Sequence, residues 1–201
     1  DIKSSYRAMS RIHCSFVFPD AIPRPFPKDD VEIEELKDIE DSFEDEFEEE
    51  TEEGLNEVAK KRKLEMMKKY QREKQKALRE LEKQKDVLLK MDVEDQLLNY
   101  SPKYNEVLTR IQTTNGTAFV YTEYKSLEGI NVLRIVLKAN GYGELVIKEE
   151  RDGFIMDVEE GDKGKPLFAV WEGSNANSEI LRKIHNNDFN DLPDNIKTKL
   201  D

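Results

Sequence analysis

Two short polar segments carry the residues whose types and spacing best suit chemistry in this sequence. The candidate residues are Thr122, Tyr124, Lys125 and Ser126 in the first segment and Gly173 and Ser174 in the second. Each segment lies directly before a predicted helix, where hydroxyls and free backbone N–H groups bind anions, and Lys125 adds a positive charge. The two segments therefore predict contacts with successive phosphates of a nucleic-acid strand, without reading its base sequence. Hydroxyl-rich segments before helices are also commonly plain N-caps, and this alternative stays open.

The elements on either side explain why the two segments should lie together. Residues 117–121 and 167–171 are short apolar runs typical of buried strands, and the spacing of apolar residues predicts helices over 127–140 and 178–185, with Gly141 capping the first. This alternation of strand and helix predicts an α/β fold with a parallel sheet and covering helices. Because connections leaving the strand carboxyl ends meet at one edge of such a sheet, we expect both polar segments there.

A further helix and a hairpin complete the expected fold of the C-terminal half. Ser101-Pro102 marks a helix start. The predicted buried face of this helix comprises Tyr104, Val107, Leu108 and Ile111. Two apolar runs, 145–147 and 154–156, flank the turn residues 151–153 and predict a β-hairpin.

No other group of residues has the spacing of a catalytic or metal site. His13 and His185 have no nucleophile placed beside them by a known motif, so structural roles are expected. The stretch 161–166 has glycines and lysines without the spacing of a phosphate loop, and the acidic residues of 157–162 lack the spacing of a calcium loop. Cys14 is the single cysteine, which excludes an internal disulfide and a cysteine-rich zinc site. We therefore expect no catalytic residue and no metal site within this chain.

Charge divides the 201 residues sharply. The net charge of −12 argues against binding of nucleic acid by bulk charge. Residues 29–53 hold 16 acidic residues against Lys37 alone, so the segment 29–54 is predicted to be disordered or to fold only on a partner. Residues 60–90 hold 13 basic and 5 acidic residues, and 55–92 contain no glycine or proline, which predicts a long charged helix. Its heptad seam is apolar at only five of eight positions, which favours a solvated or lightly docked helix over a coiled coil.

The first 28 residues form a predicted strap. Four prolines follow Phe16 and Phe18 and prevent a helix from continuing, so the two aromatic rings are expected to attach an extended segment to a neighbouring surface. No apolar run is long enough to span a bilayer, and no signal peptide is present, which predicts a soluble, intracellular protein without a membrane partner. The chain begins at Asp1 and ends at Asp201 after a helical pattern, which indicates a segment of a longer protein.

Several of these runs are similar to known motifs. Residues 119–124, with 127–130 and the glycine turn of 137–142 after them, look like helicase motif IV and its helix. Residues 168–174, followed by 178–180, are similar to the strand-GS-helix segment of Swi/Snf-like and DEAD/H-type enzymes. Together they resemble the N-terminal part of the second RecA-like domain of superfamily II helicases. The nearest likeness is to helicases of nucleocytoplasmic large DNA viruses, of the poxvirus early transcription factor type.

The resemblance implies a domain organisation. It implies an inter-domain strap after a first motor domain over 1–28, an acidic disordered segment over 29–54, a charged helical insertion over 55–100, and a partial RecA-like helicase C-terminal domain over 101–201. The implied fold class is thus α/β, a partial RecA-like parallel sheet with covering helices, interrupted by the long charged helix.

The resemblance also implies an activity. It implies a fragment of an ATP-dependent helicase or translocase serving viral transcription, with ATP and Mg²⁺ as cofactors of the full-length enzyme. A DNA or RNA strand and the transcription machinery are the implied partners, and a host cytoplasm, viral factory or virion is the implied location. The phosphate loop, the DExx motif and motifs V and VI of the family lie outside residues 1–201. This fragment alone is therefore expected to bind no cofactor and to be inactive.

Two other functions stay open. In one, the protein is a non-enzymatic interaction module whose charged helix binds a protein partner and whose α/β part is a scaffold. In the other, the acidic run regulates the protein, by folding onto the basic helix or by competing with nucleic acid for a basic surface.

Overall fold

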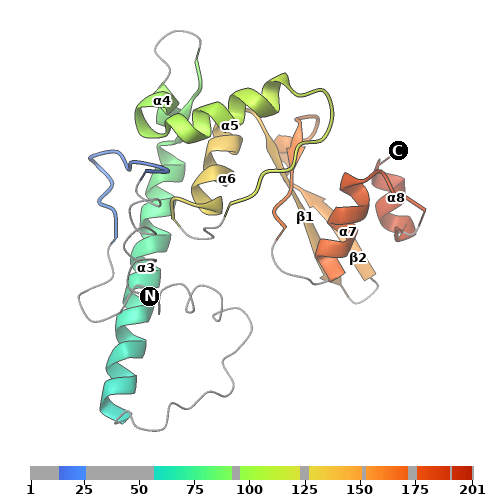
Figure 1. Ribbon diagram of the computed structural model, residues 1–201. Helices are drawn as coiled ribbons and strands as arrows, with labels where there is room; N and C mark the ends of the chain where they lie inside the picture. The colour runs from blue at the N-terminus through green and yellow to red at the C-terminus, as the bar shows by residue number, and fades with distance from the viewer. Residues whose placement is uncertain are drawn as a thin grey trace, which may run out of the picture. The chain divides into compact units, whose positions relative to one another are not determined.

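A computed structural model describes residues 14–25, 57–91, 96–122, 127–150, 153–171, 176–190 and 192–200 (Figure 1). The acidic segment 29–54 and His13 lie outside these residues. The chain divides into two compact units. Unit 1 comprises Asp1–Thr113 and Val120–Val136, and unit 2 comprises Thr114–Phe119 and Leu137–Asp201.

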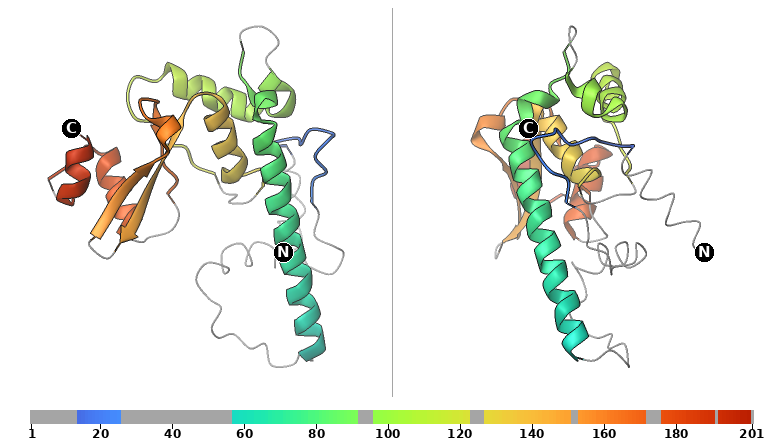
Figure 2. Two further views of the ribbon diagram at one scale, coloured as in Figure 1. Left: turned by 180° about the vertical axis from the view of Figure 1, so that it is seen from behind. Right: turned by 90° about the vertical axis from the view of Figure 1, so that its left-hand side faces the viewer.

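The long charged helix is the largest element of unit 1. Helix α3 spans Glu57–Lys83, 27 residues, as expected from a run of strong helix formers without glycine or proline (Figure 2). It ends where the N–H of Gln84 is shared between the carbonyls of Glu80 (3.2 Å) and Leu81 (3.1 Å), and the one-turn 3-10 helix η1 (Lys85–Leu88) follows. A single helix was predicted over 55–92, and α3 therefore ends earlier than predicted, at Lys83.

One face of α3 packs inside unit 1. Lys74, Ala77 and Leu81 are buried, and Leu88 of η1 is fully buried beyond them. The Lys74 ammonium lies 5.3 Å from the ring centroid of Tyr70 on the same helix. Of the heptad seam, Lys74, Leu81 and Leu88 are thus buried within the chain and Lys85 is exposed. The burial favours the docked-helix interpretation, and a coiled coil stays a prediction.

The strap is attached to unit 1 by aromatic side chains and backbone hydrogen bonds. It starts at the exposed Cys14, and Phe16, Phe18 and Ile22 are buried. The Phe16 ring lies 5.1 Å from Phe18 and 6.4 Å from Tyr100, centroid to centroid. The N–H of Val17 donates to the carbonyl of Tyr100 at 2.8 Å. The surface that the strap was expected to contact therefore lies within this chain.

Helices α4 (Gln96–Tyr100) and α5 (Pro102–Thr113) follow. Ser101 caps α5, because its hydroxyl accepts a hydrogen bond from the N–H of Tyr104 at 3.0 Å, and Pro102 takes the first helical position. The same hydroxyl donates to the carbonyl of Ser15 at 2.6 Å, which joins the cap to the strap. The predicted helix start is confirmed; of the predicted face, Tyr104 and Leu108 are buried and Val107 and Ile111 are half-buried.

Helix α6 spans Ile130–Ala139, and the division between the two units falls within it. Val132, Leu133, Ile135, Val136 and Leu137 are buried. The helix ends at Gly141, whose φ of +89° is available to glycine at little cost, and the N–H of Tyr142 returns to the carbonyl of Leu137 at 3.1 Å. The predicted glycine cap is confirmed.

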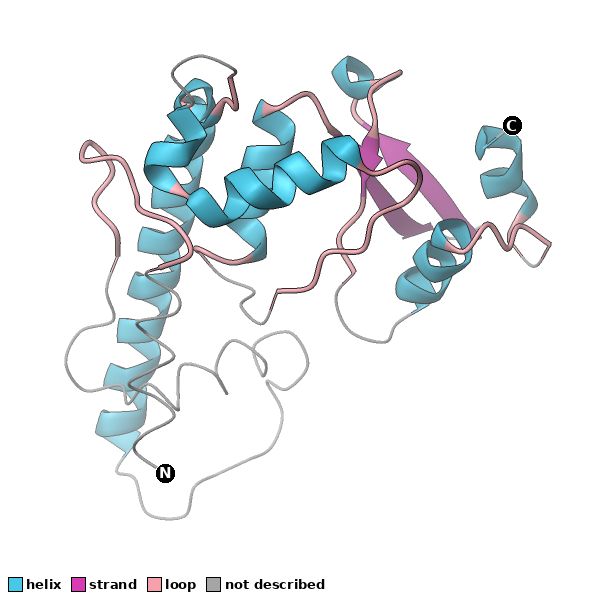
Figure 3. Cartoon of the chain, turned by 45° about the horizontal axis from the view of Figure 1, so that its top comes forward, coloured by secondary structure: helices cyan, strands magenta, loops and turns pink. Residues whose placement is uncertain are grey.

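Unit 2 contains a three-stranded sheet of order β2-β1-β3 (Figure 3). Strands β1 (Gly143–Glu150) and β2 (Gly153–Val158) pair antiparallel as the predicted hairpin. Strand β3 (Leu167–Phe168) pairs parallel with β1 through two residue pairs. The described sheet is therefore mixed, where the sequence indicated a parallel one.

Helices α7 (Ala176–His185) and α8 (Asp194–Leu200) complete unit 2. Their buried side chains form one core with the hairpin. This core comprises Leu145, Ile147, Ile180, Leu192 and Ile196. The helix predicted over 178–185 is confirmed. Among the described residues, no helix is both long and apolar enough to cross a membrane.

Two strand predictions are wrong in this structure. Residues 117–121 lie outside any strand and are exposed, with Phe119 66% and Tyr121 80% accessible. The strand predicted over 167–171 is reduced to β3, and Leu167 and Trp171 are exposed. An apolar run becomes a buried strand only where a neighbouring strand accepts its backbone hydrogen bonds, and the described residues place no such neighbour beside 117–121. The RecA-like sheet stays a prediction.

Candidate nucleic-acid interface

The structure describes one of the six predicted contact residues. Thr122 is half-buried at the end of the extended segment that follows α5. Tyr124, Lys125 and Ser126 of the first polar segment, and Gly173 and Ser174 of the second, lie outside the described residues. The site is therefore built from the residues that enter and leave the two segments.

An aromatic cluster joins the residues that precede the two segments. In unit 2 the rings of Phe119 and Trp171 meet edge to face, with centroids 6.4 Å apart and planes at 84°. His185, at the end of α7, lies 6.3 Å from Phe119. Phe119 is three residues before Thr122, and Trp171 ends the described run before the second segment. Edge-to-face pairing of this kind stabilises two rings beyond their burial, so the cluster holds Phe119 and Trp171 together within unit 2.

Helix α7 begins directly after the second segment. Ser178 and Ile180 are buried, which fixes the first turns of this ten-residue helix on unit 2. In the first turn Glu179 pairs with Arg182, Nη2 to Oε1 at 2.5 Å, and the hydrogen bond from Arg182 lowers the pKa of Glu179. A helix start in general suits an anion, because the first backbone N–H groups of a helix have no partner within the helix.

A buried polar network fixes the residues that follow the first segment. In unit 1 the guanidinium of Arg24 pairs with Glu128, and its second contact, Nη2 to Oε2, is 3.2 Å. The Tyr104 hydroxyl donates to the carbonyls of Glu128 and Gly129, the latter at 3.0 Å. The Glu128 side chain is 1% exposed and that of Arg24 13%. The strap and α5 together therefore hold the turn that enters α6.

The ionisation of Tyr104 keeps this network in one state. Burial, and to a lesser extent the negative charge of Glu128, raises the pKa of Tyr104 well above its ordinary value of 10.0. Tyr104 is thus a hydrogen-bond donor throughout the neutral and mildly alkaline range.

Sequence reasoning missed Arg24, Tyr104 and Glu128 as a connected group. Tyr104 was predicted to be buried, but only as an apolar face residue, and Glu128 was taken as part of a helix. The signal that could have found them is a charged residue inside an otherwise apolar turn, at Leu127-Glu128-Gly129-Ile130, together with an arginine between two prolines of the strap. Such a glutamate needs a cation if it is buried.

The acidic and glycine-rich stretches between residues 157 and 166 form local ion pairs within the chain. Asp162, in the 3-10 helix η2 (Glu160–Asp162), pairs with Lys165 at 2.7 Å, and this hydrogen bond lowers its pKa. The stretch 161–166 is thus a polar loop, as interpreted from its sequence. No group of histidine, cysteine, aspartate and glutamate suited to a metal ion occurs among the described residues.

Comparison with known proteins gives one informative relative. Over 103 residues the chain is 29% identical to "Putative ATP-dependent RNA helicase R563" of Acanthamoeba polyphaga mimivirus, covering 50% of this chain and 16% of the relative. No protein family and no solved structure matches the chain. The partial match supports a relationship to helicases, and the short share of the relative leaves the activity of a whole protein as a proposal.

Proposed function

We propose that this chain is part of an ATP-dependent nucleic-acid helicase or translocase, in which residues 101–201 form the N-terminal part of a RecA-like motor lobe. The partial match to a helicase-named protein of a large DNA virus supports this class. The name of that relative favours RNA as the strand and fits a viral source. A role in transcription, in a viral factory or virion, belongs to the same proposal.

The observation that carries the proposal is the Phe119–Trp171 contact. It joins, within unit 2, Phe119, which lies three residues before the first segment, and Trp171, which lies just before the second. This contact supports the expectation that both segments share one edge of a sheet. From there Thr122, Lys125 and Ser126 on one side and Gly173 and Ser174 on the other would contact neighbouring phosphates, and Tyr124 would offer a ring for stacking.

The exposed apolar residues support the same interpretation. Phe119, Val120, Tyr121, Leu167 and Trp171 are all exposed, although their runs have the composition of buried strands. Large exposed apolar groups at strand-like runs mark a surface that another element covers. In the proposed lobe, further strands of the sheet would cover them.

ATP and Mg²⁺ would be held by residues outside this chain. The chemistry supplied there is transfer of the terminal phosphoryl group to water. The contribution of residues 1–201 would be to hold the strand, so that opening and closing of two lobes moves the protein along it.

The test is the salt dependence of binding of a 20-nucleotide single-stranded RNA to the 201-residue chain. Replacing Lys125 by alanine should lower the slope of log K against log salt by about 0.7, the loss of one phosphate contact on a single strand. The control is Lys163→Ala, an exposed lysine paired with Glu160 at 3.0 Å, which should leave the slope unchanged. An unchanged slope in Lys125→Ala would remove this residue from the interface.

A second candidate function is a non-enzymatic interaction module that binds a protein partner through α3. The observation behind it is that α3 presents many exposed charged side chains. Measuring RNA-stimulated ATP hydrolysis in a protein that contains this chain separates the two candidates, since a module without motor function would show none.

A further inference from the structure

Helix α3 has one buried face and one exposed face that is rich in lysine and arginine. With 3.6 residues per turn, Lys74, Ala77 and Leu81 share one side of the helix, and this side is buried. Residues Lys68, Arg72, Lys76, Arg79 and Lys83 recur at steps of three and four residues on the opposite side, and all are exposed. We call these five residues the α3 cation stripe.

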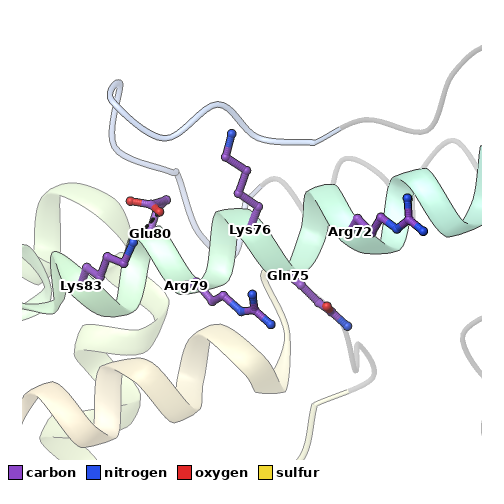
Figure 4. A pocket seen from close by; sticks show the side chains of 6 residues that line it. All are labelled: Arg72, Gln75, Lys76, Arg79, Glu80 and Lys83. Atoms are coloured by element: carbon purple, nitrogen blue, oxygen red, sulfur yellow. Dashed lines mark hydrogen bonds and ion pairs between the residues drawn. The ribbon is translucent and has the colours of Figure 1, made fainter.

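Four of the five stripe residues line a shallow hollow on the helix surface. Its volume is about 280 Å³, and its lining residues are Arg72, Gln75, Lys76, Arg79, Glu80 and Lys83 (Figure 4). Four of the six lining residues are cations. Figure 4 shows them following one another along the helix, so they form a row rather than a ring around one point.

The stripe cations differ in their ion pairing with the described residues. Lys83 pairs with Glu80 at 2.8 Å, whereas Lys68, Arg72, Lys76 and Arg79 form no ion pair with the residues that the structure describes. Four exposed cations elsewhere among the described residues each have an ion-pair partner. The comparison set is Arg110 with Glu106, Lys148 with Asp157, Lys163 with Glu160 and Arg182 with Glu179. Among the described residues the stripe thus concentrates positive charge, since Lys76 and Lys83 both act on the single carboxylate of Glu80, although the whole chain carries −12.

The spacing of the stripe suits a linear polyanion. Neighbouring cations are three or four residues apart, roughly 5 to 6 Å along the axis, and the stripe is about 22 Å long at 1.5 Å per residue. A nucleic-acid strand with about 3.4 Å per phosphate places roughly six phosphates over that length. A row of lysine and arginine along one helix face is the usual electrostatic footprint of nucleic-acid binding.

The composition of the exposed face favours nucleic acid over a protein. Every fully exposed side chain of α3 among those described is charged or is Gln75. Protein interfaces rely on aromatic and apolar anchors in a desolvated centre, and this face offers none among its described side chains. A phosphate backbone needs only cations and hydrogen-bond donors.

We propose that the α3 cation stripe is a second binding surface for a nucleic-acid strand, independent of base sequence and separate from the two polar segments. The choice of nucleic acid as the ligand rests on the proposed function, whereas the charge pattern stands by itself. Through this surface a protein containing the chain would retain its strand while the polar segments release it.

The test removes four charges from the stripe and four from elsewhere. The stripe variant carries Lys68→Gln, Arg72→Gln, Lys76→Gln and Arg79→Gln, since glutamine keeps the helix propensity and all four side chains are exposed. The matched control carries Arg110→Gln, Lys148→Gln, Lys163→Gln and Arg182→Gln, with the same loss of net charge. Binding of a 20-nucleotide single-stranded RNA to the 201-residue chain is measured by fluorescence anisotropy between 50 and 200 mM KCl, conditions that span the range in which such contacts weaken markedly.

The expected result is specific to the stripe variant. Its affinity at about 100 mM salt should fall at least tenfold, and its salt slope should drop by roughly three units, since each lost contact on a single strand removes about 0.7. The control should stay within about twofold. The double variant Lys76→Gln and Arg79→Gln should lose about half of the slope change, which preserves the test if the fourfold variant does not fold.

Three results would overturn the proposal. One is equal weakening of the stripe variant and the control, which would reduce the effect to net charge. Another is absence of RNA binding by the wild-type chain at 50 mM salt. The third is stripe-dependent binding of a polyglutamate peptide without RNA binding, which would assign the surface to an acidic protein. If Lys125→Ala leaves binding unchanged while the stripe variant loses it, the proposed polar-segment site fails and the stripe proposal stands.

Discussion

A buried ion pair in unit 1 and an exposed one in unit 2 show what position does to the same chemistry. Glu128 and Arg24 meet with side chains 1% and 13% exposed, and Tyr104 adds a hydroxyl donor to the same turn. Lys148 and Asp157 pair across the β1–β2 hairpin with side chains 55% and 47% exposed. Water screens the second pair and not the first. The first pair therefore helps to fix the turn before α6. The second pair adds little to the hairpin, which is stabilised by its buried core.

The largest expected effect comes from removing Glu128. Replacing it by alanine leaves the Arg24 guanidinium desolvated without its partner, which should cost about 3 to 5 kcal/mol of unfolding free energy. Urea unfolding followed by circular dichroism at 222 nm measures this cost. Restoration by the double variant Glu128→Leu and Arg24→Leu would show that the unpaired charge, and not lost packing, is responsible. A loss of unfolding free energy under about 1 kcal/mol would show that the Arg24–Glu128 pair contributes no more than an exposed ion pair.

A smaller effect is expected for the hydroxyl of Tyr104. The Tyr104→Phe variant keeps the buried ring and removes the donor to the carbonyls of Glu128 and Gly129, which should cost about 1 to 2 kcal/mol. The same unfolding experiment gives the value. As a control, Tyr142→Phe alters a half-buried tyrosine of unit 2 and should leave the unfolding of unit 1 unchanged.

The ionisation of Tyr104 predicts a loss of stability at alkaline pH. Its folded pKa is raised above the ordinary 10.0, so the unfolded chain releases the proton first as the pH rises. The contribution of this tyrosine is therefore complete below about pH 10 and declines above it. The urea midpoint should fall from pH 8 to pH 10.5 by more in the wild type than in Tyr104→Phe. Equal declines would show that other groups cause the alkaline loss.

The smallest effect is expected at the exposed pair. Lys148→Gln removes the interaction with Asp157, which raises the pKa of Lys148 through a direct hydrogen bond, but both groups are accessible to water. No measurable change in the unfolding midpoint is expected, because exposed pairs contribute little. The single tryptophan, Trp171, lies in unit 2 and reports this transition by fluorescence. A clear destabilisation would mean that the hairpin depends on charge more than its core suggests.

The elements that sequence reasoning predicted well are those with local signals. Helix α3 follows from uninterrupted helix formers, α5 from the Ser101-Pro102 start, and the end of α6 from Gly141. The hairpin follows from a glycine turn between two apolar runs. In each case a few neighbouring residues contain the necessary information.

The elements that it predicted poorly depend on distant partners. The strand expected over 117–121 needs a neighbour in a sheet, and the Arg24–Glu128 pair joins residues 104 positions apart. Nothing local distinguishes a glutamate that will be buried from one that will stay in water. For the candidate site, the polar composition of the two segments was visible in the sequence, but the contact between Phe119 and Trp171 that links them was not.

The exposed thiol at the head of the strap offers a practical consequence. Because Cys14 is the only cysteine and its neighbour Ser15 accepts a hydrogen bond from Ser101, a maleimide dye attached to it would sit beside the point where strap and α5 are joined. Quenching or anisotropy of that dye would register release of the strap without any change to the amino-acid sequence. Because the strap carries Arg24, its release would also separate Arg24 from Glu128. The rate of the change in dye fluorescence would therefore report how fast the turn before α6 loses this ion pair.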